Sequence, residues 1–514
     1  MITLAETKIY AHVIDESGIV EILSSKAGRS TRGRKPAFPN ATRTMLVGLM
    51  LSMSKDGKAT LSATHELLTT RLSGEAQEFL EVRRPNGEVI SEKILYRTWE
   101  RAVDNITWTH EAKPDLSARD RVRRRRAART VVNQLMDVFD IGHLSNSFAL
   151  DGTGIRSWST GRHDTKMTTN GQVHRGLSDP DAHWGHKTPG VGETSEIFGY
   201  ENHVLMQVPD YGQDVSDIPL LIRRLALIPS AKSNANQMLK LIDQLPQHQP
   251  VGDLLVDRWY SNLRTENWAD GLIRRGINQV LDLRKDDHGF SLRDRMLWTA
   301  GVPHCPGTPQ QLGTIRRPGP ANRTPNAVEQ FETAIRQRQA YAMHIHQRKL
   351  DQQRLVVTCP AVYGTVGCPL KEGSVAVAHA SDLPVVTPPK HPLPGCCSAA
   401  SGTVTVSISS PDRKHHQRHY WGSAKWAKSI ARRSYVEGVF GQQRNKSLEA
   451  LDRGQHRFMG LAANLLCNAL VAASYNLRTI RAWNDNRPAP DTTNPLFADI
   501  PTPAVWFESA VDAA

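Results

Sequence analysis

The sequence predicts an α/β protein built around a mixed or parallel sheet, with a helical region before it and a β-rich insertion within it. In residues 145–284, short apolar runs alternate with helical patterns, which is typical of strands connected through helices. Residues 1–144 have the apolar periodicity of helices. Residues 285–412 are rich in proline, glycine and short β-prone runs, and helical patterns return in residues 413–487.

The N-terminal region, residues 1–144, is predicted to be helical and basic. Helical periodicity is clear in TRTMLVGLMLSMSKDGKATLSATHELL and in SEKILYRTWERAVDNI. Two basic clusters lie within it, GRSTRGRKPAF from Gly28 and RDRVRRRRAAR from Arg119 to Arg129. The second cluster is either a solvated helix face or a direct contact to DNA phosphates. Its candidate DNA-binding residues are Arg123, Arg124, Arg125 and Arg126.

Four apolar runs in residues 145–284 are predicted to be strands. They are SFALDGTGI, YENHVLMQV, GDLLVDRWYSN and INQVLDL. Between the second and third runs, SDIPLLIRRLALIPSAKSNANQMLKLIDQL is predicted to be helical, and SNLRTENWADGLIRRG is predicted to form a helix after the third.

Residues 285–412 are predicted to be an inserted β-rich subdomain. RLVVTCPAVYGTV and GTVTVSISS are its β-prone pieces, and a short helix near Ala327–Gln347 precedes them. Its cysteines allow a structural zinc ion, although they lack paired CxxC motifs; the alternative is that they are small buried hydrophobic residues. The candidate zinc ligands are Cys359, Cys368, Cys396 and Cys397.

The last segments are a pair of helices and a tail. In residues 413–487, KWAKSIARRSYVEGVFGQQRNK is predicted to be one helix. HRFMGLAANLLCNALVAASYNLRTIRAW is apolar nearly all round and is predicted to be a core helix. Residues 488–514 are rich in proline and are predicted to be a loose tail.

The charge of the chain favours a polyanionic partner. Its 64 Lys and Arg against 51 Asp and Glu give a net charge of +13, which is typical of nucleic-acid-binding proteins, although a merely basic soluble protein would also fit. No apolar run of about 18 residues is present, so we expect no membrane span. The N-terminal residues lack a secretory pattern, and the six cysteines favour a reducing cytoplasm over a disulfide scaffold.

Two of the predicted strands reach an aspartate where the apolar run stops, Asp151 and Asp257. Because sites in α/β sheets form at the carboxyl ends of strands, we expect these carboxylates to lie close together. Carboxylate oxygens are ligands that Mg²⁺ prefers, and two such ions can activate a water and stabilise the leaving oxygen of a phosphodiester. The alternative is that each aspartate caps a turn.

A third carboxylate, Glu437, lies in a strongly basic segment. Residues 413–446 contain nine Lys or Arg and this single acid. On a helix, Arg433, Glu437 and Arg444 share one stripe, so a metal-binding carboxylate would be flanked by guanidinium groups suited to phosphate. The alternative is an ordinary surface ion pair between Arg433 and Glu437.

The ordered blocks of the sequence resemble a known family. ALDGTGI, SDPDAHWGHKT with FGYENHVLMQV, LLVDRWYSN, RRSYVEGVFGQQRNK and GLAANLLCNALVAASYNLR resemble those of DDE transposases of bacterial insertion sequences. The similar branch has a ribonuclease H-like catalytic domain, a mixed sheet flanked by helices, that a β-rich insertion interrupts before the glutamate. The 180 positions between Asp257 and Glu437 leave room for such an insertion. One departure is Ile430, where the fuller family signature has tyrosine.

The resemblance implies metal-dependent cleavage at the ends of a mobile element and joining of the freed 3′-hydroxyl to target DNA. Asp151, Asp257 and Glu437 would be the catalytic residues and would hold two Mg²⁺ or Mn²⁺ ions. The implied partners are double-stranded DNA, as terminal inverted repeats and as target, and a second copy of the chain in a synaptic complex, all within the nucleoid of a bacterial cytoplasm. The residues implied to contact DNA are Arg432, Arg433, Arg444 and Lys446.

Other readings of these residues remain open. DGTG after a strand and the pair Asp286–Asp287 are similar to haloacid-dehalogenase phosphatases, but Thr153 stands where that motif has its second aspartate. A transposase-derived DNA-binding protein without activity is a further alternative. Asp179 and Asp181 are rival carboxylates for which turn stabilisation is expected. Four aromatic residues could stack on an unpaired base or pack in the core: Trp259, Tyr260, Trp421 and Trp426.

Overall fold

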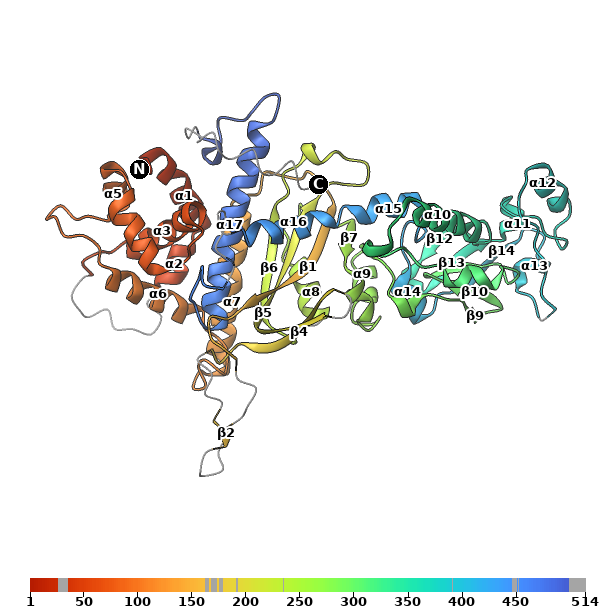
Figure 1. Cartoon of the computed structure of the whole chain (residues 1–514), viewed down its shortest axis with the longest axis horizontal. Coiled ribbons are helices and arrows are strands. Elements are labelled where there is room, and N and C mark those ends of the chain that lie inside the picture. Colours follow the sequence, from red (N-terminus) through yellow and green to blue (C-terminus); the bar gives the residue numbers. More distant parts are fainter. Residues whose placement is uncertain are drawn as a thin grey trace.

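A computed structural model shows a mixed α/β protein, which confirms the predicted fold class at this level. The molecule is elongated, with N-terminal helices at one end, a mixed sheet in the middle and residues 285–412, which contain both helices and short strands, at the other end (Figure 1). The structure describes residues 1–25, 36–161, 166–167, 173–174, 179–190, 193–233, 235–390, 392–445, 451 and 453–498.

The N-terminal region is helical as far as Asp137. Threonine and serine side chains at Thr3, Thr60 and Ser117 accept backbone N–H groups of the following turn and so define where three of its helices begin. Most of GRSTRGRKPAF lies outside the described residues. The helices are α1 (Leu4–Ser17), α2 (Ile19–Ser24), α3 (Ala41–Asp56), α4 (Leu61–Glu66), α5 (Gly74–Phe79), α6 (Glu92–Ile106) and α7 (Ala118–Asp137).

The central sheet contains all four predicted strands. Its main strands are β1 (Ser147–Arg156), β4 (His183–Gly190), β5 (Glu193–Val208), β6 (Ile222–Pro229), β7 (Asp253–Val256) and β8 (Asn278–Val280). The order is β4-β5-β1-β7-β8, and β6 pairs with the second half of β5. β1 is antiparallel to β5 but parallel to β7, which is parallel to β8, so the sheet is mixed. A short pair, β2 (Lys166–Met167) and β3 (Val173–His174), follows β1.

The helix predicted before the third strand is wrong in its first half, which forms β6. The apolar run lies between Pro219 and Pro229, so it is short for a helix, and its backbone groups pair with β5. Asn476 also binds the backbone of Ile222, accepting from its N–H at 2.9 Å and donating to its carbonyl at 2.8 Å. Among the described residues, the α-helix in the first of these predicted segments is α8 (Ala235–Ile242), and the second segment forms the 3₁₀ helix η3 (Arg258–Asn262) and a short α9 (Ala269–Ile273).

The segment after β8 contains two three-stranded sheets and several helices. One sheet comprises β9 (Ser291–Arg293), β10 (Met296–Thr299) and β11 (Val302–His304), and the other β12 (His344–Lys349), β13 (Arg354–Thr358) and β14 (Thr403–Ser407). The predicted helix is α10 (Pro325–Ala340), and the shorter ones are α11 (Pro360–Tyr363), α12 (Ser374–Ala380), α13 (Gly395–Ser398) and α14 (Ser410–His415). An ion pair from Arg413 to Asp270 at 2.8 Å holds α14 against α9.

Three helices complete the chain: α15 (Ala424–Ala431), α16 (Ser434–Gln443) and α17 (Leu461–Asp485). The single helix predicted from KWAKSIARRSYVEGVFGQQRNK is therefore broken by a turn at Arg432 and Arg433. The predicted core helix is confirmed, because α17 is buried on nearly all sides and packs against α7 and β6 (Figure 1). None of the helices in the described ranges has the length and apolar character to cross a membrane.

The beginning of the tail is anchored rather than loose. It forms the 3₁₀ helix η8 (Pro495–Phe497), in which Leu496 is 2% exposed. Arg481 of α17 donates to the Leu496 carbonyl at 2.6 Å. The prediction of a loose tail is therefore wrong as far as Ala498, and residues 499–514 lie outside the described part of the chain.

Candidate active site

Two aspartates stand side by side on neighbouring parallel strands. The last register pair of β1 and β7 is Leu150 with Val256, so Asp151 and Asp257 are the next residues on each strand. β7 ends there, and Asp257 caps η3, accepting the Arg258 N–H at 2.6 Å. The apolar pattern had indicated that β1 ends at Asp151. The strand instead continues to Arg156, because its pairing with β5 extends that far.

Asp151 is largely enclosed. Its side chain is 19% exposed, and its two oxygens accept hydrogen bonds from the Gly152 N–H at 2.8 Å and from Arg433 Nη1 at 3.1 Å. Burial raises the pKa of Asp151 above its usual range; Arg433 and the Gly152 N–H oppose the shift, and the charges of Asp257 and Glu437 add to it. The three predicted carboxylates therefore lie within electrostatic range of one another.

α16 brings the third carboxylate to the same place. Val436, Val439 and Phe440 are buried and pack this helix against β1 and β5. Glu437 is 56% exposed, and its carboxylate accepts from Arg433 Nη2 at 2.5 Å. The guanidinium of Arg433 therefore bridges Asp151 on the sheet and Glu437 on the helix.

The electrostatics of Arg433 follow from this position. Burial lowers the pKa of Arg433, but the charges of Asp151, Glu437 and Asp257 outweigh the burial and leave the pKa raised. The guanidinium is thus a permanent cation held among three carboxylates. Sequence analysis had assigned Arg433 to DNA phosphate, with an ion pair to Glu437 as the alternative, and the pairing with Asp151 was not foreseen.

The donor set matches the chemistry of Mg²⁺, which takes carboxylate oxygens. Within the described residues, no three His, Cys, Asp or Glu side chains form a ready-made metal-binding group. At the carboxylates, the guanidinium of Arg433 is within hydrogen-bonding distance of both Asp151 and Glu437. Ligands and charge fit a divalent ion there once this side chain moves away.

Arg444 and Arg432 have different surroundings, although both were predicted to contact DNA. Arg444 caps the end of α16 and donates to the Thr153 hydroxyl and to the Gly154 carbonyl, at 3.1 Å for the latter, so it ties α16 to β1 just beyond Asp151. Arg432 is buried and forms an ion pair with Asp253 at 3.1 Å. Its guanidinium is not accessible to a DNA phosphate in this structure. Lys446 lies outside the described residues.

The four arginines predicted on α7 divide into two pairs. Arg123 forms an ion pair with Asp120 at 3.0 Å, and Arg124 donates to the Asp104 carbonyl and lies 3.7 Å from its carboxylate. The side chains of Arg125 and Arg126 are exposed and make no hydrogen bond or ion pair with any described residue. Of these four arginines, the second pair is therefore exposed and not engaged by a described residue.

Three of the four predicted aromatic residues belong to the interior. Trp421 and Trp426 are each 1% exposed, and Tyr260 is 2% exposed. Burial, followed by nearby carboxylates led by Asp151, raises the pKa of Tyr260 well above its usual value. Trp259 differs, because it is 42% exposed two residues after Asp257 and meets Tyr260 edge-on with ring centroids 5.2 Å apart.

The rival carboxylates Asp179 and Asp181 have structural partners. Asp179 is fully buried and accepts hydrogen bonds from Ser157 Oγ and Tyr200 Oη, both at 2.6 Å. Asp181 accepts the N–H of Leu461 at 2.8 Å and so caps the beginning of α17. Both aspartates make buried contacts to distant elements, rather than the local turn contacts that were expected.

A buried polar layer next to Asp151 was missed by sequence analysis. His203 on β5 lies opposite Gly152, and a Cβ atom on Gly152 would stand 2.9 Å from the histidine ring. His203 Nε2 lies 2.9 Å from Ser233 Oγ, which also hydrogen-bonds to Glu201. Packing against His203 therefore requires glycine after Asp151. The Asp-Gly pair in the sequence was a signal of this close contact.

The cysteines predicted as zinc ligands are reduced, and all but Cys397 are buried. Cys305, which the prediction left out, is a neighbour of Cys359, Cys397 and Cys368, and burial raises its pKa to about 12. These thiols are not arranged as a metal-binding group among the described residues. Their burial fits the alternative of small hydrophobic side chains in the interior of the insertion.

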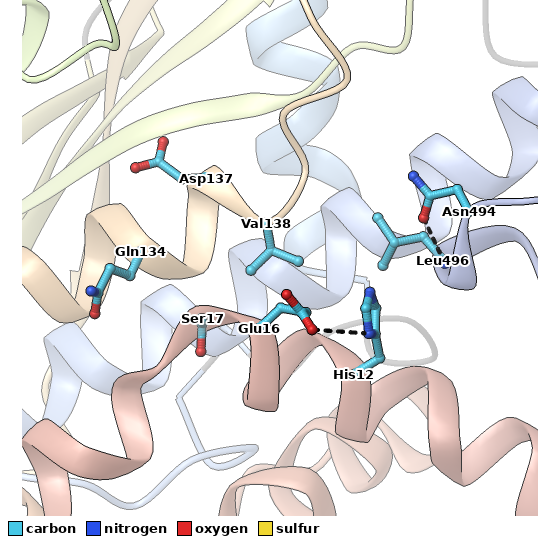
Figure 2. A pocket seen from close by; sticks show the side chains of 8 residues that line it. All are labelled: His12, Glu16, Ser17, Gln134, Asp137, Val138, Asn494 and Leu496. Carbon is cyan, nitrogen blue, oxygen red and sulfur yellow. Dashed lines mark hydrogen bonds and ion pairs between the residues drawn. The ribbon is translucent and has the colours of Figure 1, made fainter.

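A cavity of about 370 Å³ lies away from the carboxylates, where the tail meets α1 and α7 (Figure 2). His12 Nδ1 and Glu16 Oε1 approach to 3.9 Å at its edge. None of the candidate site residues lines it. The lining residues are His12, Glu16, Ser17, Gln134, Asp137, Val138, Asn494 and Leu496.

Comparisons with protein-family models, with curated proteins and with solved structures gave no match to this chain. Its function must therefore be inferred from its own residues and their arrangement.

Proposed function

We propose that the chain is a DDE transposase, which binds the ends of its mobile element and catalyses metal-dependent phosphodiester cleavage and strand transfer into target DNA. One observation carries the proposal. Asp151 and Asp257 are the next residues after a register pair of parallel strands, and Glu437 on a helix packed against β1 pairs with the same guanidinium as Asp151. This is the carboxylate set that the family resemblance implies for a ribonuclease H-like catalytic domain.

The order of the elements supports the same assignment. The sheet is mixed, and a segment with two small three-stranded sheets and several helices enters after β8 and ends before α15 and Glu437. A contact between α14 and α9 attaches this segment to the sheet domain. In the resemblance, a β-rich insertion interrupts the ribonuclease H-like domain at the same place, between the second aspartate and the glutamate.

In this proposal the three carboxylates hold two Mg²⁺ or Mn²⁺ ions. Bound there, such ions supply activation of a water or hydroxyl nucleophile and stabilisation of the leaving oxygen. Asp151 and Asp257 are positioned by backbone pairing of β1 with β7, and Glu437 by the packing of α16. Arg433 and Arg444, at the two ends of α16, orient phosphate groups of the DNA strand.

The charge distribution supports DNA as the partner. The chain carries +13, and Arg125 and Arg126 present exposed guanidinium groups on α7 at the N-terminal side of the sheet. We assign terminal-repeat binding to this side of the molecule and expect a dimer in the synaptic complex. Such a protein acts on the nucleoid in the bacterial cytoplasm.

A transposase-derived DNA-binding protein without activity is the second candidate. The position of Arg433 favours this candidate. Its guanidinium pairs with Asp151 and Glu437, and a protein that binds no metal could keep such an arrangement. A phosphatase is disfavoured. Thr153 is buried and bonded to Arg444, and Asp287 pairs with Arg284 at 3.0 Å, so neither position offers a second catalytic acid.

The test is strand cleavage of DNA that carries the sequences flanking the gene, with Mg²⁺ or Mn²⁺. The unmodified protein is expected to cut at the element ends, whereas Asp151→Ala, Asp257→Ala and Glu437→Ala lose cleavage and keep DNA binding. Asp214→Ala, an exposed carboxylate that caps η2 (Val215–Asp217), is the matched control and should cleave normally. Cleavage that survives all three substitutions contradicts the site. Binding without cleavage by the unmodified protein favours the second candidate.

A further inference from the structure

Arg433 makes two contacts that an ordinary surface pair does not explain. Its pair with Glu437 spans one helical turn and alone would be a common exposed ion pair. The other contact, 3.1 Å to Asp151, joins residues 282 positions apart, in the turn before α16 and on the central strand β1. Asp151 is 19% exposed and Arg433 is 22% exposed, so this second pair is substantially shielded from solvent.

The carboxylates need a cation whether or not a metal is bound. Burial disfavours the ionised form of Asp151, and repulsion from the negative charges of Asp257 and Glu437 disfavours it further. A guanidinium offers several donors in one plane and remains charged, so it can serve two carboxylates at once. Arg433 Nη1 reaches Asp151 and Nη2 reaches Glu437, each through a separate nitrogen.

We propose that Arg433 is a built-in counter-cation of the carboxylate site, which a divalent ion must displace before the site can work. This inference rests on the proposed function, because it concerns the same three carboxylates. It gives the arginine two states: in the first the guanidinium bridges Asp151 and Glu437, and in the second it is released toward solvent.

The geometry around the α15–α16 turn allows this exchange without moving the helices. The neighbouring Arg432 is buried and holds the turn through hydrogen bonds to the Pro209 carbonyl at 3.0 Å and to Ser147 Oγ at 2.9 Å. α16 is also fixed by its buried apolar residues. The displaced part is therefore the long side chain of Arg433, and its guanidinium becomes available to a DNA phosphate when the ion enters. Metal binding and phosphate contact are thus coupled through one residue.

The test measures Mn²⁺ binding to the full-length chain by calorimetry, in the absence of DNA. Removing the competing cation by Arg433→Ala is expected to tighten Mn²⁺ binding roughly tenfold, because a shielded charge pair no longer opposes the ion. Arg433→Lys keeps a positive charge but not the two-nitrogen bridge, so its affinity should lie between those of the other two proteins. Circular dichroism on each variant reports that the chain is folded.

Two further variants provide controls. Arg336→Ala removes a guanidinium from the exposed pair with Glu332 on α10, and it should bind Mn²⁺ as the unmodified protein does. Asp151→Asn should abolish the binding in both the normal and the Arg433→Ala background. These variants separate local competition from a general change in net charge.

The outcomes distinguish the inference from the proposed function. Tighter Asp151-dependent binding by Arg433→Ala supports the inference, as does binding seen only in that variant. Equal or weaker binding by folded Arg433→Ala, with Asp151-dependent binding by the unmodified protein, overturns the inference and leaves the proposed function standing. No Asp151-dependent binding by either protein overturns both.

Discussion

Arg432 provides a prediction that separates a structural arginine from a DNA-binding one. Its guanidinium donates to Ser147 Oγ at 2.9 Å and to Asp253 Oδ2 at 3.1 Å, and these residues face each other at the start of β1 and β7. The side chains of Arg432 and Asp253 are 8% and 7% exposed. Arg432→Ala would therefore leave a buried carboxylate whose remaining charge partner is Arg418 at 3.4 Å.

The expected cost of Arg432→Ala follows from this burial. Breaking a buried ion pair by removing one partner destabilises a protein by about 3–5 kcal/mol. For a domain of roughly 200 residues this lowers the melting temperature by roughly 10 °C. Scanning calorimetry on the full-length protein measures the shift. Adding Asp253→Asn removes the stranded charge, so the double variant should lose less than the sum of the two single losses.

DNA binding by the same variant tests the alternative, that Arg432 contacts a DNA phosphate. A phosphate-contacting arginine changes the slope of log affinity against log salt by about 1, whereas a structural one leaves this slope unchanged in the folded protein. We expect no change of slope for Arg432→Ala at a temperature where it is folded. A normal melting temperature together with a shallower slope would refute the structural assignment.

Replacing Arg125 and Arg126 together by alanine should reduce the salt slope of DNA binding by about 2 without changing the melting temperature; an unchanged slope places the DNA elsewhere. Asp181→Ala should destabilise the protein by about 1 kcal/mol through loss of the α17 cap, and Asp181→Asn by less, as judged by thermal unfolding. Burial lowers the pKa of His416 to about 4. As the pH falls below 6.5, this histidine is therefore protonated in the unfolded chain before it is protonated in the folded protein. The free energy of unfolding should fall by roughly 3 kcal/mol from pH 6.5 to pH 4. His416→Gln should lose less over this range, and an equal loss in denaturant titrations would contradict the assignment.

The pairing of Asp151 with Asp257 could be predicted from sequence because it depends on local patterns. An apolar run that stops at a carboxylate marks the end of buried parallel pairing, and the register of β1 and β7 brings these two residues together. Glu437 could be predicted from its helical spacing to apolar residues on the packed face of α16. The core helix α17 was equally clear, since apolar residues surround it.

The different fates of Arg432 and Arg433 could not be predicted, because they depend on a turn. Both arginines were placed on one continuous helix, but the chain breaks between α15 and α16, so that Arg432 pairs with Asp253 at the start of β7 and Arg433 pairs with Asp151 on β1. β6 was missed for a related reason. Its apolar run suits a helix or a strand, and the free edge of β5 decides between them.

The central claim is that the three carboxylates bind the metal ions required for DNA cleavage. The most direct test measures DNA cleavage by Asp257→Cys with Mg²⁺ and with Mn²⁺. A thiolate is a poor ligand for Mg²⁺ and a better one for Mn²⁺. We predict no cleavage of element ends by this variant in Mg²⁺ and recovered cleavage in Mn²⁺, with Asp257→Ala inactive in both. Equal cleavage by Asp257→Cys in the two metals, or activity of Asp257→Ala, would contradict the claim.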